Sequence, residues 1–402
     1  MSVEGMKRVL SNGDFLKLWI GQVVSNIGDE VAFIGLAALI VFRWNGTATD
    51  VSLFFIFASL PVLIFGPIAG VFVDRWKRKT TMIWADIIRS VIALGFIFST
   101  QLWHLLILIF LLSTVSRFFY PARNALIPNI VNEEKLIEAN SLSQMTYMLA
   151  VVIGPGLGAA LVALLGYTTT FIFDSASYLF SALMIFLIGH KERIVRGGKK
   201  ALNEMVEGFK YMAKNRIVRL LVTLFGLIML VVGGLNVIYT LYIRDVLHMN
   251  IVGLGILETS FGIGAIIGSI LVGFVAGKMK NVHMIGVGVI LIGFLISLMA
   301  ALPFFLMALL VAFGIGAMNS LLSSPSNAIL QKAIEDKYRG KVFGAQGAVI
   351  QGAALISMGM MGLLISIFGI INILIFSGIY VTAIGTYLLL NKKAEKLMDI
   401  VD

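Results

Sequence analysis

The sequence predicts an all-α membrane protein with twelve transmembrane helices in two pseudo-symmetric six-helix bundles. Three observations lead to this prediction: the composition, the lengths of the apolar segments and an internal repeat. Apolar residues make up 59% of the 402 residues and charged residues only 13%, and the mean hydropathy is +0.98. Because a soluble domain carries about 25% charged residues, this chain has too few to cover its surface in water.

The apolar segments have the length of membrane spans. A hydrocarbon core about 30 Å thick needs about 20 apolar residues per helix, and a helix satisfies its own backbone polar groups in lipid. Twelve segments meet this requirement: Phe15–Phe42, Val51–Val73, Thr81–Ser99, Leu102–Ile127, Ser141–Leu165, Thr168–Ile188, Ile217–Ile243, Gly253–Ala276, His283–Ala301, Phe304–Leu330, Phe343–Phe368 and Ile370–Leu390.

The longest polar break in the chain divides these spans into two sets of six. We expect an N-terminal bundle over 1–189, a cytoplasmic linker over 190–216 and a C-terminal bundle over 217–402. Within the linker, Ala201–Lys214 has apolar residues at helical spacing and predicts an amphipathic helix on the membrane surface. A solvated linker between two halves is the alternative interpretation.

The two halves are related by an internal repeat. A shift of 203 residues aligns Asn124 with Asn327 and Gly166 with Gly369, and it also aligns the stretches that begin at Gly70 and Gly273. Two related six-helix halves are typical of secondary transporters, whose substrate sites lie near the midplane of the membrane.

The composition excludes several kinds of chemistry. The chain has no Cys, so it forms no disulfide, Cys-ligated zinc site or thiol nucleophile. The four histidines are scattered, no GxxxxGK[ST] motif occurs, and no paired catalytic cluster is present. We therefore expect no metal, no cofactor, no ATP site and no enzymatic activity.

The basic residues indicate the orientation of the chain. The formal net charge of +10 would suggest a nucleic-acid partner in a soluble protein, but here the charges lie in loops. Of 31 Lys and Arg, Arg43 and Arg244 fall in loops on one side, and Arg89 and Arg117 fall inside spans. The others lie at the termini and after even-numbered spans. The positive-inside rule predicts that both termini are cytoplasmic. We expect a multi-pass protein of the plasma membrane without a nucleic-acid partner.

Three stretches carry a resemblance to the major facilitator superfamily along essentially the whole chain. From Gly70 to Lys79 the sequence reads GVFVDRWKRK, similar to that superfamily's GxxxDRxGRK signature, with Lys77 where a second Gly is usual. From Gly154 to Gly158 it reads GPGLG, which resembles the GPxxG element of proton-coupled antiporters. The stretch PARNALIP that begins at Pro121 resembles the macrolide-efflux-like multidrug branch.

The resemblance implies a major facilitator fold and a secondary transporter that exports amphipathic small molecules by proton antiport with alternating access. Its expected partners are a lipophilic or cationic substrate, protons and membrane lipids, and it is expected to work as a monomer. Transport of a lipid, a siderophore or another endogenous amphiphile is the alternative. A membrane-embedded enzyme or receptor is a more distant one.

The first span carries the most informative polar residues. Gln22, Asn26 and Asp29 recur at intervals of three and four with Glu30 beside them, so they form one helical face that cannot point into lipid. Asp29 lies near the middle of its span, and Arg117 lies near the middle of the fourth. We expect Asp29, with Glu30 as alternate, to couple protons to substrate and Arg117 to tune it. A static buried pair is the alternative.

Other polar residues in the spans are weaker candidates. Asp174 and Glu258 lie near the outer ends of their spans, where they could bind protons or cations or extend to the interface. Asp86 and Arg89 predict a local structural pair. Gln22 and Asn26 are expected to face a cavity or another helix. Residues that could line a cavity, or simply pack in the core, are Tyr147, Tyr178, Asn236, Tyr239 and Phe261.

The two motifs also have physical interpretations. Asp74 is the one acid in a basic loop, and a carboxylate there can latch the cytoplasmic side by binding a helix N-terminus or a neighbouring Arg. The alternative is that the loop only fixes topology. The remaining predicted motif residues are Gly70, Arg75 and Arg78 in this gating loop, and Gly154, Pro155 and Gly158 at a close, kinked helix contact.

Overall fold

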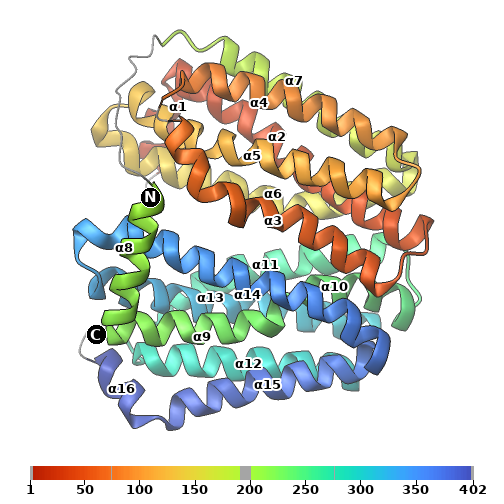
Figure 1. The fold of residues 1–402 in the computed structure, drawn as a ribbon, viewed down its shortest axis with the longest axis vertical. Helices are drawn as coiled ribbons and strands as arrows, with labels where there is room; N and C mark the ends of the chain where they lie inside the picture. Colours follow the sequence, from red (N-terminus) through yellow and green to blue (C-terminus); the bar gives the residue numbers. More distant parts are fainter. Residues whose placement is uncertain (1–2, 74, 191–200, 276, 400–402) are drawn as a thin grey trace. The chain divides into compact units, whose positions relative to one another are not determined.

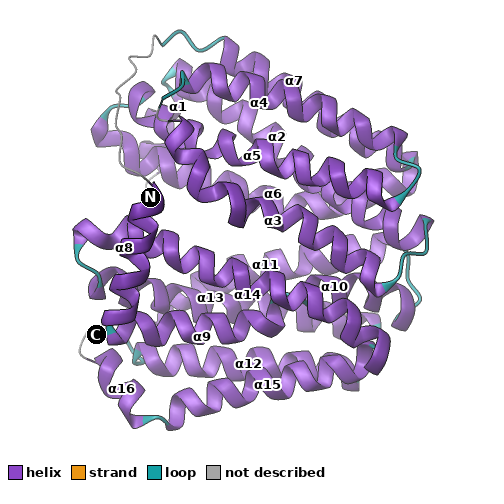
Figure 2. Cartoon of the chain, in the orientation of Figure 1, coloured by secondary structure: helices purple, strands orange, loops and turns teal. Residues whose placement is uncertain are grey.

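The computed structural model describes residues 3–73, 75–190, 201–275 and 277–399. Within these ranges the regular structure is helical, and twelve helices are long and apolar enough to cross a membrane (Figures 1 and 2). The spans of the first half are α2 (Gly13–Ala38), α3 (Ala48–Val73), α4 (Arg78–Gly95), α5 (Leu102–Ile130), α6 (Leu136–Leu165) and α7 (Tyr167–Phe186). The predicted all-helical, twelve-span fold is therefore confirmed.

The second half repeats this order. Its spans are α9 (Arg216–Val232) with α10 (Leu235–Leu241), α11 (Ile251–Val275), α12 (Asn281–Ala301), α13 (Phe305–Ala333), α14 (Arg339–Phe368) and α15 (Ile370–Leu390). Short helices α1 (Val3–Leu10), α8 (Ala201–Lys214) and α16 (Lys392–Asp399) lie outside the spans. The seventh span, expected as one continuous helix, is interrupted at Gly233–Gly234 between α9 and α10.

Contacts divide the chain into two compact units. The first unit comprises Met1–Arg43 and Phe57–Leu202, and the second comprises Trp44–Ile56 and Asn203–Asp402. The segment Trp44–Ile56, which includes the start of α3, therefore groups with the second half of the sequence. Ser52 illustrates this grouping, because its hydroxyl oxygen lies only 2.6 Å from where a Cβ on Gly362 of α14 would be.

The internal repeat is visible in the helix bounds themselves. Shifting α5 and α6 by 203 residues reproduces α13 and α14 at both ends. The same shift relates Gly166 and Gly369, which have φ of +85° and +79° at the two shortest turns between spans. Because this backbone region favours glycine, both turns depend on the residue type that the repeat conserves.

An asparagine caps the first span of each unit, and the two caps make equivalent hydrogen bonds. The Asn12 side chain accepts hydrogen bonds from the first turn of α2 and donates one to the carbonyl of Ile130, 2.7 Å away. Asn215 caps α9 likewise and donates to the carbonyl of Ala333 at 3.2 Å. Each asparagine thus satisfies the orphan N–H groups of one helix and ties that helix to the end of another.

In the first unit, α2 and α7 approach closely along a stripe of glycines. Gly21, Gly28 and Gly35 recur every seven residues on α2, and a Cβ on any of them would contact α7. The residues of α7 that it would meet are Ser181, Met184, Asp174, Ser177 and Thr170. Small residues allow such contacts between membrane helices, and this contact positions the polar side chains of α7 beside α2.

Candidate functional site

The first unit contains a polar cavity of about 190 Å³ near the middle of its spans. Side chains from α2, α3, α5, α6 and α7 line it. Predicted site residues on its wall are Asn26, Asp29, Glu30, Arg117, Tyr147 and Tyr178. The structure therefore brings together the acids of the first span and the arginine of the fourth, as the helical spacing on α2 indicated.

Asp29 is held by a tyrosine. The Tyr178 hydroxyl donates a short hydrogen bond to Asp29 Oδ1. Arg117 Nε donates instead to the carbonyl of Ser113 at 3.4 Å, and its guanidinium lies 5.5 Å from the ring centre of Tyr120. Asp29 and Arg117 thus share one cavity, while their hydrogen bonds in the described part of the chain go to other partners. The static Asp29–Arg117 pair is not formed in this structure.

Arg89 supports the tyrosine that holds Asp29. Its guanidinium pairs with Asp86, and both side chains are at most 1% exposed. It also lies between two rings, 4.2 Å from the centre of Phe119 and 4.4 Å from that of Tyr178. The predicted Asp86–Arg89 pair is therefore present, and Arg89 links it through Tyr178 to the cavity.

Of the two alternatives for Asp174, a proton or cation site and extension to the membrane interface, the structure does not show the second. The residue is fully buried, and neither carboxylate oxygen has a hydrogen-bond partner in the described chain. The Ser177 hydroxyl donates to the backbone carbonyl of Asp174. The cause of the burial is the close α2–α7 contact, because Asp174 Oδ1 lies 2.9 Å from where a Cβ on Gly28 would be.

A second set of polar residues on α5 escaped the sequence prediction. Arg123 donates to Gln22 Oε1 at 3.4 Å, and its guanidinium lies 5.4 Å from the ring centre of Tyr120. Tyr120 therefore lies between Arg117 and Arg123 on one face of α5. Their spacing of three residues predicts that they share one face of α5. A search for charged residues at the middle of a span does not detect this pattern.

The glycines of the GPxxG element contact the acidic part of α2. A Cβ on Gly154 would overlap the side chain of Glu30, and a Cβ on Gly158 would lie 2.9 Å from the carbonyl oxygen of Val31. Pro155 is buried between them. The predicted close contact is present, and its position beside Glu30 joins the motif to the cavity.

The predicted gating loop is only partly described. Asp74 lies outside the described residues. Gly70 has open space around its Cα, since a Cβ there would meet nothing within 4 Å. Arg75 is exposed, whereas Arg78 donates to the carbonyl of Ala125 near the end of α5, 3.1 Å away.

The predicted residues of the second unit lie apart from any comparable charge network in the described chain. Glu258 is partly buried on α11. Tyr239 is buried, and its hydroxyl has no partner among the described residues. Asn236 is exposed, and Phe261 of α11 packs its backbone against Gly316 of α13.

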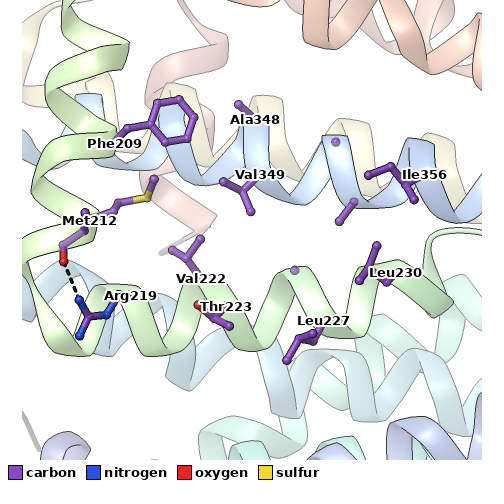
Figure 3. A pocket seen from close by; sticks show the side chains of 14 residues that line it. Phe209, Met212, Arg219, Val222, Thr223, Leu227, Leu230, Ala348, Val349 and Ile356 are labelled. Atoms are coloured by element: carbon purple, nitrogen blue, oxygen red, sulfur yellow. Dashed lines mark hydrogen bonds between the residues drawn. The ribbon is translucent and has the colours of Figure 1, made fainter.

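The second unit instead contains an apolar groove of about 670 Å³ (Figure 3). Phe209 and Met212 of α8 close one end, and the walls come from α9 and α14. Val222 and Leu230 face Val349 and Ile356 across it in Figure 3. Arg219 is the one charged residue on the wall, and it donates to the carbonyl of Ala213 at 2.8 Å.

Twelve apolar helices, two repeated units and a polar cavity at mid-span define a multi-pass membrane protein built like a transporter. The family model of the Major Facilitator Superfamily matches residues 18–254 and 221–398. The chain belongs to the Major Facilitator Superfamily. It is a transporter of this type rather than an enzyme.

Relatives of known name resemble the chain over most of its length. Macrolide efflux protein A of Streptococcus pyogenes is 26% identical over 386 residues, which cover 92% of this chain and 94% of that protein. Multidrug efflux pump Tap of Mycolicibacterium fortuitum is 23% identical over 371 residues, covering 87% and 88%. The resemblance to the macrolide-efflux-like branch is confirmed.

Solved structures share the fold. A bacterial homologue of the iron transporter ferroportin in an inward-facing state matches with a TM-score of 0.73 and 15% identity, covering 93% of this chain and 98% of that one. A POT family transporter in complex with a thioalcohol-conjugated peptide matches with a TM-score of 0.76 and 13% identity, covering 94% and 96%. At these identities the likeness concerns the fold alone.

Proposed function

We propose that this protein exports amphipathic small molecules, drugs among them, across the plasma membrane by proton antiport with alternating access. The observation that carries the proposal is the cavity in which Asp29, Glu30 and Arg117 meet inside a transmembrane unit. Charged residues at such depth cost at least about 2.5–3.5 kcal/mol each, so their presence together is a functional signal. The efflux relatives named above support export as the direction.

Asp29 is the proposed proton carrier. As an anion it accepts the Tyr178 hydrogen bond and is attracted by Arg89 and Arg117. Protonation removes that negative charge, which weakens the hydrogen bond from Tyr178 and ends the attraction between Asp29 and the two arginines. A change of this kind shifts the balance between two packings of the helices, and alternating access requires such a shift.

A cationic substrate competes for the same carboxylate. A positive group beside Asp29 favours its ionised form, so substrate entry expels the proton and proton entry expels the substrate. Glu30 stands next to Asp29 on the same wall and is the alternate carrier. Asp174 and Glu258 are proposed only as secondary sites, because neither faces this cavity.

The substrate class follows from the lining of the two units. Few charges are available in the spans to neutralise a multiply charged substrate such as a sugar phosphate. The first unit offers carboxylates and tyrosines, and the second offers the apolar groove. A weakly basic, largely apolar molecule suits both environments. Macrolides, which the name of one relative mentions, have this chemistry.

The proposed orientation places both termini in the cytoplasm. A cysteine introduced at Gly46 is then labelled from outside the cell, and one at Gly340, beside the α13–α14 turn, only from inside. The natural chain has no Cys, so no background label interferes. External labelling at Gly340 would reverse the proposed orientation.

Transport by purified protein in proteoliposomes tests the function. We expect a pH gradient to drive uphill accumulation of a lipophilic cation or a macrolide, and Asp29→Asn to abolish it while downhill exchange of neutral substrates persists. The matched control is Asp336→Asn, because Asp336 is an exposed carboxylate paired with Arg339. Uphill transport by Asp29→Asn at the wild-type rate would remove Asp29 from the mechanism.

A further inference from the structure

A groove of about 620 Å³ lies between α4 and α5 in the first unit, beside the short connection before α4. Its two ends differ in chemistry. Arg75, Lys77, Thr80 and Thr81 form one end, while Trp84, Ile88, Val115 and Phe118 form an apolar trough. The proposed export reaction uses none of these side chains.

The basic residues of this connection fall into two groups. Arg78 donates to the carbonyl of Ala125 at 3.1 Å, and Lys79 donates to that of Ile188 at 2.6 Å, so both are bound to the ends of neighbouring helices. Arg75 and Lys77 are exposed, and their side chains make no hydrogen bond or ion pair with the described residues. Two cations are thus left at the mouth of an apolar groove.

The trough continues along an exposed apolar face of α4, and such a face of a transmembrane helix is expected to contact acyl chains. Trp84, Ile88 and Val91 follow one another along α4 at helical spacing and are 59%, 44% and 65% exposed. At the polar end, the Trp76 ring stacks on Phe118 with ring centres 6.1 Å apart. Tryptophan beside basic residues is the usual composition of a membrane–water interface.

The corresponding place in the second unit lacks these features. There, 203 residues later, Lys280 replaces Lys77 and pairs with Glu395 at 3.1 Å. The residue in place of Trp84 is Val287, and the residue in place of Phe118 is Leu321. The repeat therefore keeps both positive charges, with Lys278 in place of Arg75, but Lys280 is paired and the aromatic walls occur in the first unit.

We propose that the α4–α5 groove binds one anionic glycerophospholipid. The phosphate of the lipid lies between Arg75 and Lys77 within reach of the Thr80 hydroxyl, and one acyl chain runs along Trp84 and Ile88. The first turn of α4 adds N–H groups, since Lys77 at its N-cap makes no side-chain cap. A lipid satisfies the cations and the trough together, whereas a small soluble anion satisfies only the cations.

Native mass spectrometry of the detergent-purified full chain tests this site. The protein is titrated with phosphatidylglycerol or with phosphatidylcholine carrying the same acyl chains, and binding of the first lipid is compared. Two positive side chains near a lipid phosphate predict a preference of at least about tenfold for phosphatidylglycerol. Glycerol phosphate, which lacks acyl chains, is expected not to compete at equal concentration.

Two matched variants locate the preference. Arg75→Gln with Lys77→Gln should reduce it to below about threefold, because both counter-charges are removed. Lys278→Gln with Lys280→Gln changes the equivalent positions of the second unit and should leave it unchanged. Trp84→Ala keeps the charges and removes apolar wall, so it should weaken phosphatidylglycerol binding by at least about threefold.

Three results would overturn the proposal. The first is equal binding of the two lipids by wild-type protein, a comparison that needs no variant to fold. The second is a preference that survives in the Arg75→Gln, Lys77→Gln protein. The third is full competition by glycerol phosphate, which would make the groove a site for small anions. None of these outcomes depends on whether the protein exports drugs.

Discussion

The two halves of the sequence have closely matching helix bounds and differ at the middle of their first span. In the first unit this position holds Asp29 and Glu30 on an unbroken α2. In the second unit the equivalent residues are Val232 and Gly233, where α9 ends. One repeat therefore carries charge at mid-span and the other carries an interruption of the helix. The duplicated scaffold is shared, and the ionisable chemistry is concentrated in one copy.

Two residues further along the first span, each unit has a close contact between a glycine and a larger side chain, and the glycine lies on opposite helices in the two units. In the first unit, Val31 of α2 packs against Gly158 of α6. At the equivalent place in the second unit, Gly234 packs against Met361 of α14. The small residue has moved from one helix to the other while the helices remain in contact. This exchange shows that the repeat preserves the volume of the contact rather than the residues.

The second difference is in α4 and its counterpart α12. Asp86 and Arg89 are buried in the first unit, and the equivalent residues Val289 and Ile292 are buried in the second. The fold thus accommodates either an ion pair or two aliphatic side chains at this position. Because a buried ion pair often contributes little net stability compared with apolar residues, the pair in α4 calls for a functional explanation.

The largest expected effect comes from breaking that pair. Arg89→Ile leaves the Asp86 carboxylate buried without its partner and should lower the free energy of unfolding by about 3–5 kcal/mol. Asp86→Val with Arg89→Ile installs the residues of the second unit and should recover most of the loss. Thermal unfolding in detergent measures both, and Arg339→Gln, which breaks an exposed pair, should cost less than about 1 kcal/mol. A double variant as unstable as Arg89→Ile alone would show that the units are not interchangeable here.

The next largest loss of stability is expected at the contact between Val31 and Gly158. Gly158→Met overpacks the α2–α6 contact and should destabilise the protein by about 1–3 kcal/mol. Adding Val31→Gly recreates the arrangement of Gly234 and Met361, so the double variant should be more stable than Gly158→Met. Chemical unfolding curves compare the two proteins. If adding Val31→Gly lowers the free energy of unfolding further, the glycine and the larger residue cannot be swapped between the two helices.

A smaller effect is expected from the hydrogen bond to Asp29. A double-mutant cycle of Tyr178→Phe with Asp29→Ala should give a coupling energy of about 1–2 kcal/mol, since the acceptor is charged. Tyr242→Phe is the control, because that hydroxyl donates to the neutral carbonyl of Met299 at 2.8 Å in the second unit. Its coupling to Asp29→Ala should be near zero. Equal coupling energies of Tyr178→Phe and Tyr242→Phe with Asp29→Ala would mean that the hydrogen bond from Tyr178 to Asp29 contributes no stability of its own.

The smallest effect tests the equivalence of the units. Asn12→Ala and Asn215→Ala each remove one helix cap and one bond to a neighbouring carbonyl, and each should cost about 1 kcal/mol. Because the two caps have the same geometry, we expect the two losses to agree within about 0.5 kcal/mol. A larger difference, measured by thermal unfolding, would show that one unit limits stability.

Most of the fold could be predicted from the sequence because membrane spans have a fixed length and a plain composition. The predicted twelfth span, Ile370–Leu390, has the bounds of α15. The break at Gly233–Gly234 could not be predicted in this way, since glycine occurs throughout the spans. It depends on Ala354 and Met361 of another helix, and hydropathy does not report such contacts.

The candidate site was predictable where one helix carries the signal. Asn26 and Asp29 share a face of α2, so helical spacing was enough to place them on the cavity. The position of Arg89 between Phe119 and Tyr178 joins three helices and has no local pattern. The burial of Asp174 could not be predicted, because the distance from the end of a span does not reveal which face of the helix is buried.

The claim that proton coupling resides in the first unit is tested most directly by substrate-induced proton release from the purified protein. A weakly buffered detergent solution with a pH indicator reports protons released when a lipophilic cation binds. The account predicts release by wild type and by Glu258→Gln, a variant of the second unit, and its loss in Asp29→Asn. Release at the wild-type level by both Asp29→Asn and Glu30→Gln, with loss in Glu258→Gln, would place the coupling in the second unit and contradict the account.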